Sequence, residues 1–304
     1  MGPNDSPEPR ERLLAAIAAR DASVPALQAL WKDRAAELAA WQSAPELHGA
    51  LAARLLRLGS PMLALEVAAD ALERGPADVS LRRSQALALA RTGGHERANL
   101  ILQTLVAEGH GDEETRGILA RTYKDMALAS HDSGQRKRLL RKAFDTYAAA
   151  FGLHPESYWT GINAATLAML LRDEAQAGRL ARSVRDVCQA RLAQAPGDAE
   201  RFWLCATLAE AELDMRRPDL AAPLYREAYA LAPRRFGDLN SARRQARVLL
   251  AHLGEDPAAA EDWLPMPRVL VFAGHMMDAQ NRPLPRFPAH QEPAVKAALV
   301  ERLR

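Results

Sequence analysis

The sequence predicts an all-α protein, a solenoid built from antiparallel helix pairs that stack one on the next. The first observation behind this prediction is composition: apolar residues make up 48 % of the chain but aromatic residues only 5 %, so Ala and Leu supply most of the apolar surface. Both are strong helix formers, and small side chains let helices pack closely. The second observation is a repeat of 34 residues that begins near residue 50. β-branched residues are sparse before Val269, which disfavours a fold rich in sheet.

The N-terminal part of the chain, residues 1–43, predicts a divergent helix pair. Its two helices are expected within Glu11–Arg20 and Val24–Ala40. The residues before them are polar, contain three prolines and lack the apolar core of a signal peptide.

The repeat region, residues 44–254, has the strongest pattern in the sequence. Three small residues recur at a spacing of 34: Ala52, Ala86 and Ala120. Each is expected where the two helices of a pair meet, because a larger side chain there would push the helices apart. Gly59 and Gly93 share this spacing and are expected to end first helices in a conformation that a Cβ disfavours. The period and these residues resemble the tetratricopeptide repeat, and the resemblance implies a right-handed superhelix of antiparallel helix pairs.

Two further pairs follow after a break in the register. Around residues 130–138 the spacing shifts by 11 residues, which predicts an insertion that is either a loop or an extension of the first helix. A fourth pair is expected over residues 158–195, and a fifth over residues 198–233. Residues 237–253 predict a closing helix with Arg244 on the side that faces water.

One segment within the fourth pair is more specific than the repeat. Residues 158–167 read YWTGINAATL, which resembles the signature of the TRAF-binding, central regulatory region of apoptosis-signal-regulating kinases. Bacterial tetratricopeptide proteins carry a similar region. The resemblance covers about residues 80–255 and implies a helical module that binds partners and sets the activity of an attached domain. The sequence has no Gly-rich loop, H-R-D or D-F-G motif, so only the scaffold carries over and not the kinase activity.

Gly161 and Asn163 are unusual residues for the interior of a helix, where Gly costs up to about 1 kcal/mol relative to Ala. Gly161 could allow the close approach of a neighbouring helix or of a ligand, and Asn163 could hold a peptide backbone on the inner surface. The favoured interpretation is that Gly161 serves packing and that Asn163 caps a local distortion. Ligand binding is the alternative.

The composition changes after the repeats. Residues 255–267 predict a linker with an acidic, Trp-containing patch, and residues 268–304 predict the start of an incomplete α/β domain, formed by a strand, a loop and a helix. Ligands of such sheets bind beyond the carboxyl ends of the strands, so Gly274, His275 and Asp278 form a candidate ligand-binding site. The segment also resembles the stretch that follows the repeats in the bacterial relatives, where it opens an effector or ligand-sensing domain. One strand does not complete a sheet, so we expect the chain to be a fragment, and the alternative is a strand that pairs with something else.

The tetratricopeptide resemblance implies that the first helix of each pair lines a concave groove. The candidate peptide-binding residues are basic in the early pairs and aromatic or amide in the later ones: Arg57, Arg83, Arg91, Arg121, Lys124, Trp159, Asn163 and Trp203. An acidic peptide or a C-terminal carboxylate would complement this groove, because Arg binds a carboxylate through two parallel hydrogen bonds. The alternative is that several of these arginines are ordinary surface residues.

Composition and missing motifs disfavour several functions. The 40 basic and 38 acidic residues nearly balance, unlike the charge of a nucleic-acid binder. The two cysteines, Cys188 and Cys205, give no disulfide framework and indicate a reducing compartment. No apolar run approaches the roughly 18 residues that span a bilayer. We therefore expect a cytoplasmic protein that binds neither nucleic acid nor membrane.

The sequence also lacks a phosphate-binding loop, a dinucleotide-binding glycine motif, zinc-ligand spacing and a nucleophile elbow. We therefore expect no catalytic residues, no metal site and no cofactor, and we do not expect an enzyme. The sequence predicts a signalling scaffold that binds a protein or peptide in its groove and controls an attached effector domain. The alternative is a signalling protein that senses a nucleotide or another small ligand at a site beginning at Gly274 and His275.

Overall fold

The computed structural model describes residues 8–75, 78–233 and 235–266. The N-terminal elements are α1 (Pro9–Ala18), α2 (Val24–Lys32), the short 3-10 helix η1 (Asp33–Glu37) and α3 (Leu38–Ser43). The repeat pairs are α4 (Glu46–Arg57) with α5 (Pro61–Arg74), α6 (Val79–Arg91) with α7 (His95–Ala107), α8 (Glu113–Ala129) with α9 (Ser133–Leu153), α10 (Tyr158–Leu170) with α11 (Glu174–Leu192), and α12 (Asp198–Asp214) with α13 (Pro218–Leu231). They are followed by α14 (Phe236–Leu253) and α15 (Ala259–Trp263).

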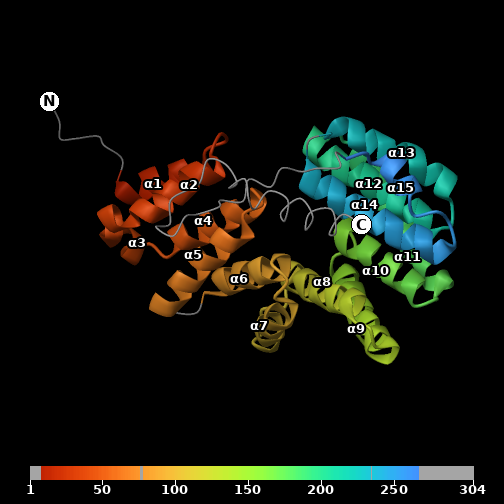
Figure 1. Cartoon of the computed structure of the whole chain (residues 1–304), viewed down its shortest axis with the longest axis horizontal. Helices are drawn as coiled ribbons and strands as arrows, with labels where there is room; N and C mark the ends of the chain where they lie inside the picture. Colours follow the sequence, from red (N-terminus) through yellow and green to blue (C-terminus); the bar gives the residue numbers. More distant parts are fainter. Residues whose placement is uncertain (1–7, 76–77, 234, 267–304) are drawn as a thin grey trace, which may run out of the picture.

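Figure 1 shows these helices arranged as an arc, with α1–α5 at one end, α6–α9 along its middle and α10–α15 at the other end. Every regular element in the described part of the chain is a helix, so the predicted all-α solenoid is confirmed. No helix among these residues is long and apolar enough to cross a membrane.

The repeat pairs pack as the 34-residue period predicts. The two helices of each pair lie against each other, and the second helix of one pair packs on the first helix of the next. Ala52, Ala86 and Ala120 are fully buried, so a larger side chain at any of them would separate packed helices. The first helices α4 and α6, α6 and α8, and α10 and α12 also contact one another, which places them on the inner side of the arc.

In four of the five repeat pairs, the turn between the paired helices has one residue in the left-handed conformation. Gly59 and Gly93 take this position, with φ values of 78° and 92°. In the fourth and fifth pairs the same position is taken by Arg172 (φ 65°) and Arg216 (φ 61°). Both arginines have a Cβ, so their backbone is strained where the glycines are not.

The insertion in the third pair lengthens its helices. α8 has 17 residues and α9 has 21, and only residues 130–132 lie between them. The extra residues are therefore neither a loop nor chiefly an extension of the first helix, because most of them form the start of α9. Asp132 caps that helix by accepting a hydrogen bond from the backbone N–H of Gln135.

The N-terminal segment differs in detail from the expected pair of helices. Its second helix is divided into α2, η1 and α3, which surround the buried Trp31 and Trp41. These two indoles and the imidazole of His48 contact one another edge to face, with ring centroids 5.0 to 5.8 Å apart. Trp31 Nε1 also donates a hydrogen bond of 2.8 Å to Glu66 Oε1, which ties the segment to α5.

The last helices depart from the regular stack. α14 packs on α12 and reaches α10, whereas α15 lies against α13. Residues 255–266, which the composition predicts to be a linker, thus pack against the last repeat pair: the buried Trp263 stacks on Tyr225, with ring centroids 5.8 Å apart. The predicted strand, loop and helix of residues 268–304 lie outside the described residues.

Candidate functional site

The inner face carries a row of polar side chains that runs from α8 through α10 and α12 to α14. Lys124 Nζ on α8 donates a hydrogen bond of 2.6 Å to Asn163 Oδ1 on α10. Asn163 Nδ2 in turn donates to the backbone oxygen of Trp159, 2.9 Å away. Burial lowers the pKa of Lys124, although the nearby Glu210 and Asp125 act in the opposite direction. The amide of Asn163 is therefore held at both ends by the protein itself.

The row continues to α12 and α14 through two carboxyl groups. Thr166 Oγ1 donates a hydrogen bond of 2.6 Å to Glu210 Oε1 and lies 3.3 Å from Asp214 Oδ2. Gln245 Nε2 donates a further hydrogen bond of 2.8 Å to Glu210 Oε1. Burial raises the pKa of Glu210, and burial with the neighbouring Glu210 raises the pKa of Asp214 well above its ordinary range. The folded protein therefore holds the proton of Asp214 more tightly than the unfolded chain does.

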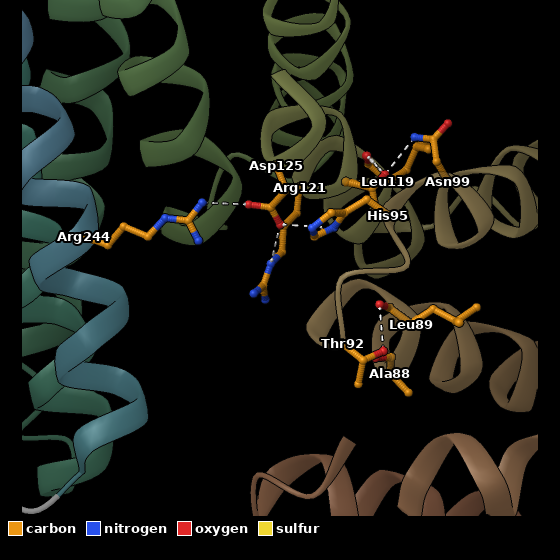
Figure 2. A network of polar contacts seen from close by, with 10 residues as sticks. Ala88, Leu89, Thr92, His95, Asn99, Leu119, Arg121, Asp125 and Arg244 are labelled. Carbon is orange, nitrogen blue, oxygen red and sulfur yellow. Dashed lines mark hydrogen bonds and ion pairs between the residues drawn. The ribbon is translucent and has the colours of Figure 1, made fainter. Parts of the chain in front are cut away.

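Beside this row, two arginines and a histidine from three helices surround the buried Asp125. Figure 2 shows Arg244 reaching from α14 toward α8, where its Nη2 lies 3.3 Å from Asp125 Oδ1. Arg121 Nε lies 3.6 Å from Asp125 Oδ2, and His95 Nδ1 lies 4.0 Å from the same oxygen. This carboxylate thus joins the middle of the arc to its far end.

A cavity of about 460 Å³ lies among α6, α7, α8 and α14. It is lined by Ala90, Arg91, Gly93, His95, Arg121, Asp125, Leu128, Ala129 and Arg244. Arg91 Nη1 donates a hydrogen bond of 2.5 Å to the backbone oxygen of Leu56, and burial together with the neighbouring Arg121 lowers the pKa of Arg91. Three guanidinium groups share this cavity with one carboxylate, so an additional anionic group would balance its charge.

A hydrogen bond joins α7 and α8, which both contribute residues to the wall of this inner cavity. The buried Asn99 donates through Nδ2 a hydrogen bond of 2.7 Å to Thr122 Oγ1, and that hydroxyl donates to the backbone oxygen of Leu119, also at 2.7 Å (Figure 2). Because α7 begins at His95, the same contact between the two helices holds the imidazole beside the arginines.

Comparisons with known proteins agree with this architecture. Residues 62–168 match the family model described as "TPR-S: Tetratricopeptide Repeats-Sensor". Among solved structures, a thermophilic tetratricopeptide-repeat protein of Thermus thermophilus is similar at 22 % sequence identity and a TM-score of 0.53, over 68 % of this chain and 99 % of that chain. The chain has the tetratricopeptide-repeat fold. No curated protein matches it.

The tetratricopeptide solenoid brings together four of the predicted groove residues. Arg91 and Arg121 line the inner cavity. Lys124 and Asn163 belong to the polar row that adjoins it.

Trp159 lies on α10 one helical turn before Asn163. Its indole is 38 % exposed and meets Tyr147 edge to face, with ring centroids 6.2 Å apart. The ring also covers Gly117 on α8, where a Cβ would lie 2.3 Å from the indole. The glycine therefore makes room for this aromatic side chain.

The other three predicted residues do not line the inner cavity. Arg83 Nη1 is paired with Asp112 Oδ2 at 2.8 Å and with Glu114 Oε2 at 2.9 Å. Trp203 packs against the hydrophobic core of the C-terminal helices, and Arg57 is exposed in the last turn of α4. The inner cavity therefore includes only part of the predicted basic groove.

Arg244 lies on the exposed side of α14, as the sequence predicts, although its guanidinium also contacts Asp125. The acidic residues of the site, Asp125, Glu210 and Asp214, are not among the residues that the sequence predicts. One pattern could have found two of them: Glu210 and Asp214 are four residues apart, so they share one face of a helix whose other residues are largely apolar.

No group of His, Cys, Asp or Glu within the described ranges is placed to hold a metal ion. The candidate ligand-binding residues Gly274, His275 and Asp278 lie outside the described residues.

Proposed function

We propose that the protein is an interaction and regulatory scaffold, which binds an acidic protein or peptide segment in the inner cavity and controls an effector domain attached to it. Tetratricopeptide and related solenoids generally use their concave surface to bind protein partners. The observation that supports an acidic partner is the charge of the cavity, where Arg91, Arg121 and Arg244 accompany the single carboxylate of Asp125.

A carboxylate suits this cavity in hydrogen bonding as well as in charge. Each guanidinium has five N–H donors, and charge-assisted hydrogen bonds are about 2.7–2.9 Å long. The distances from Asp125 to Arg244 and Arg121 are 3.3 and 3.6 Å, so both guanidinium groups keep donors for a ligand. A side-chain or C-terminal carboxylate of a partner would accept these remaining hydrogen bonds.

Fluorescence polarisation with labelled acidic peptides tests the binding proposal. The panel pairs each peptide with its C-terminally amidated form and with a version in which amides replace the carboxylates. We expect the acidic peptides to bind. The double variant Arg91→Ala, Arg121→Ala should bind them at least about tenfold more weakly, because a hydrogen bond to a charged group contributes about 1.5–3 kcal/mol.

Arg179→Ala, on the exposed surface of α11, is the matched control and should bind like the wild-type protein. Equal affinities of the double variant and the wild-type protein would refute the proposal. The same holds for equal affinities of acidic and amidated peptides.

The regulatory part of the proposal is supported by the resemblance of residues 158–167 to a kinase regulatory region. It predicts that peptide binding in the inner cavity changes the chain after α15. Hydrogen–deuterium exchange of residues 267–304, measured with and without a saturating acidic peptide, tests this expectation. Identical exchange in the two samples would leave the protein as a binding scaffold without the regulatory role.

A second candidate function is the sensing of a nucleotide or another small ligand. The specific observation in its favour is the word "Sensor" in the description of the family model that matches residues 62–168. The ligand site would begin at Gly274 and His275 and include Asp278. A thermal-shift screen with nucleotides should raise the melting temperature of the wild-type protein but not of His275→Ala, and the absence of any shift would exclude nucleotides.

A further inference from the structure

A second cavity, of about 320 Å³, lies between α11 and the turn from α12 to α13. Four arginines line this cavity, which we call the arginine pocket: Arg182, Arg185, Arg216 and Arg217. None of these residues lines the inner cavity, so the two sites are separate and neither the predicted groove nor the proposed function includes this one.

The turn after α12 contributes two of the four arginines. Arg216 has a φ of 61°, in the left-handed region where earlier pairs have glycine. Arg216 Nη1 lies 2.9 Å from Glu174 Oε1 at the start of α11, and Arg217 Nη2 lies 2.7 Å from Glu212 Oε2. These two guanidinium groups are therefore already balanced by carboxylates of the protein.

α11 contributes the other two arginines, and these are not balanced in the same way. Arg185 has only a loose contact of 3.4 Å with its exposed neighbour Asp186. Arg182 has no carboxylate partner among the described residues, and its Nη1 would lie 3.4 Å from a Cβ placed on Gly178. The guanidinium of Arg182 thus lies over a glycine, beside an open space.

Buried polar atoms without partners form part of the same pocket. Asp214 is only 1 % exposed, lines the pocket and has no hydrogen-bond partner for Oδ1. Nε of Arg217 is also buried without a partner. Buried polar atoms are nearly always satisfied in folded proteins, so these atoms indicate that a further polar group belongs here.

We propose that the arginine pocket binds the phosphate group of a phosphate monoester. The two unbalanced guanidinium groups of Arg182 and Arg185 match the charge of about −1.5 to −2 that such a phosphate carries at neutral pH. Phosphate oxygens accept hydrogen bonds from several arginines at once, and a protonated Asp214 would donate another. The volume of about 320 Å³ is at the lower end of the range of about 300–1,000 Å³ for small-molecule sites, which suits one phosphate with a small attached group.

Isothermal titration calorimetry with inorganic phosphate, in a phosphate-free and sulfate-free buffer, tests this proposal on the full chain. We expect the wild-type protein to bind, and the variant Arg182→Ala, Arg185→Ala to bind at least about tenfold more weakly, because each removed side chain donates charge-assisted hydrogen bonds. Arg179→Ala, one helical turn before Arg182 and outside the pocket, should bind like the wild-type protein.

Thermal unfolding in the same buffer shows whether the double variant is folded. The milder single variant Arg182→Gln gives an independent measurement and should also bind more weakly than the wild-type protein. The absence of phosphate binding to the wild-type protein would overturn the proposal, and so would unchanged binding to Arg182→Gln or to a folded double variant.

The source of the phosphate group is decided by two more titrations. One uses glycerol phosphate, and the other uses a phosphoserine peptide with its unphosphorylated form as the control. Tighter binding of glycerol phosphate supports a small phosphorylated molecule, whereas tighter binding of the phosphoserine peptide supports a phosphorylated protein. Failure of both to bind would overturn the assignment to phosphate monoesters, even if inorganic phosphate binds.

Discussion

Asp214 shows how burial changes the chemistry of a single carboxyl group. Its side chain is enclosed at the end of α12, close to Thr166 and Glu210, and burial raises its pKa well above the ordinary range. The folded protein therefore keeps the proton of Asp214 at pH values at which the unfolded chain has released it. The proton is bound more tightly in the folded state, so Asp214 stabilises the fold most at low pH.

Raising the pH should lower the free energy of unfolding through the titration of Asp214. The contribution of Asp214 to the free energy of unfolding is fully present below its pKa in the unfolded chain, which is about 4. This contribution is lost as the pH rises toward the pKa of Asp214 in the folded protein. Asp214→Asn keeps the shape and removes the titration, so its free energy of unfolding should fall less than that of the wild-type protein between about pH 4 and about pH 8. Urea denaturation at several pH values measures both slopes, with the exposed Asp219→Asn as the control. Parallel slopes for Asp214→Asn and the wild-type protein would contradict the raised pKa.

Close packing explains why residue 161 is a glycine. A Cβ there would lie 2.5 Å from Val184 Cγ2 and 2.8 Å from the ring of Phe151, and both of these side chains are buried. Gly161→Ala should therefore lower the free energy of unfolding by about 1–3 kcal/mol, in spite of the better helix propensity of Ala.

The matched control is Gly152→Ala on α9, where a Cβ would meet nothing within 4 Å. It should be neutral or stabilise the protein by up to about 1 kcal/mol. Chemical denaturation of the three proteins checks both values. If the two variants behaved alike, packing would not explain Gly161, and close approach of a ligand would become the better explanation.

Among the elements, α14 is a helix that the sequence predicts, but the sequence does not predict the surface on which it packs. The pattern of residues 237–253 shows which face of the helix is apolar, and the structure has α14 at Phe236–Leu253. An apolar face does not reveal which surface it will cover, because that depends on helices distant in the sequence. α14 covers α12 and α10 rather than extending the stack, and this position brings Arg244 to α8 and Gln245 to α12.

The ion pair between Arg244 and Asp125 should hold α14 in this position. Arg244→Ala leaves the buried Asp125 with a weaker partner, and we expect a loss of about 0.5–1 kcal/mol, because the Arg244 side chain is itself 58 % exposed. Arg247→Ala on the same helix, which removes an exposed contact of 3.7 Å with Glu261, should cost less. Hydrogen exchange of the α14 amides reports the difference. Equal exchange in the two variants would show that apolar packing alone positions the helix.

For the whole molecule, the sequence was sufficient to predict the repeat but only part of the candidate site. Small residues such as Ala52 and Ala86 mark helix contacts between neighbours in the chain, so their spacing is sufficient to predict the pairs. Arg91 and Arg121 could be predicted because they lie on first helices. Asp125 and Glu210 meet side chains of α14, and Arg244 of that helix is more than a hundred residues from Asp125 in the sequence. No local pattern records such a contact.

The hydrophobic residues of the described chain form four clusters along the arc rather than one common core. In such solenoids each unit is stabilised chiefly by its neighbours. Trp263→Ala, which empties the place beside Tyr225, should therefore destabilise the C-terminal pairs by about 3–5 kcal/mol and leave α4 and α5 unaffected. Hydrogen exchange resolved by segment measures this, with the exposed Leu220→Ala as the control. A uniform loss of protection along the chain would show instead that the arc unfolds as one unit.

The position of α14 has a thermodynamic consequence. This helix supplies one wall of the inner cavity through Arg244, and α15 follows it in the chain. If an effector domain is attached beyond α15, as the proposed function requires, a partner that draws Arg244 away from Asp125 acts on the helix that leads to that domain. By linkage, if the partner changes an equilibrium of the effector domain by a given factor, a shift in that equilibrium must change the affinity for the partner by the same factor. The coupling between the inner cavity and the effector domain would then act in both directions. A mutation in that domain would be detected as a change in peptide affinity at the cavity.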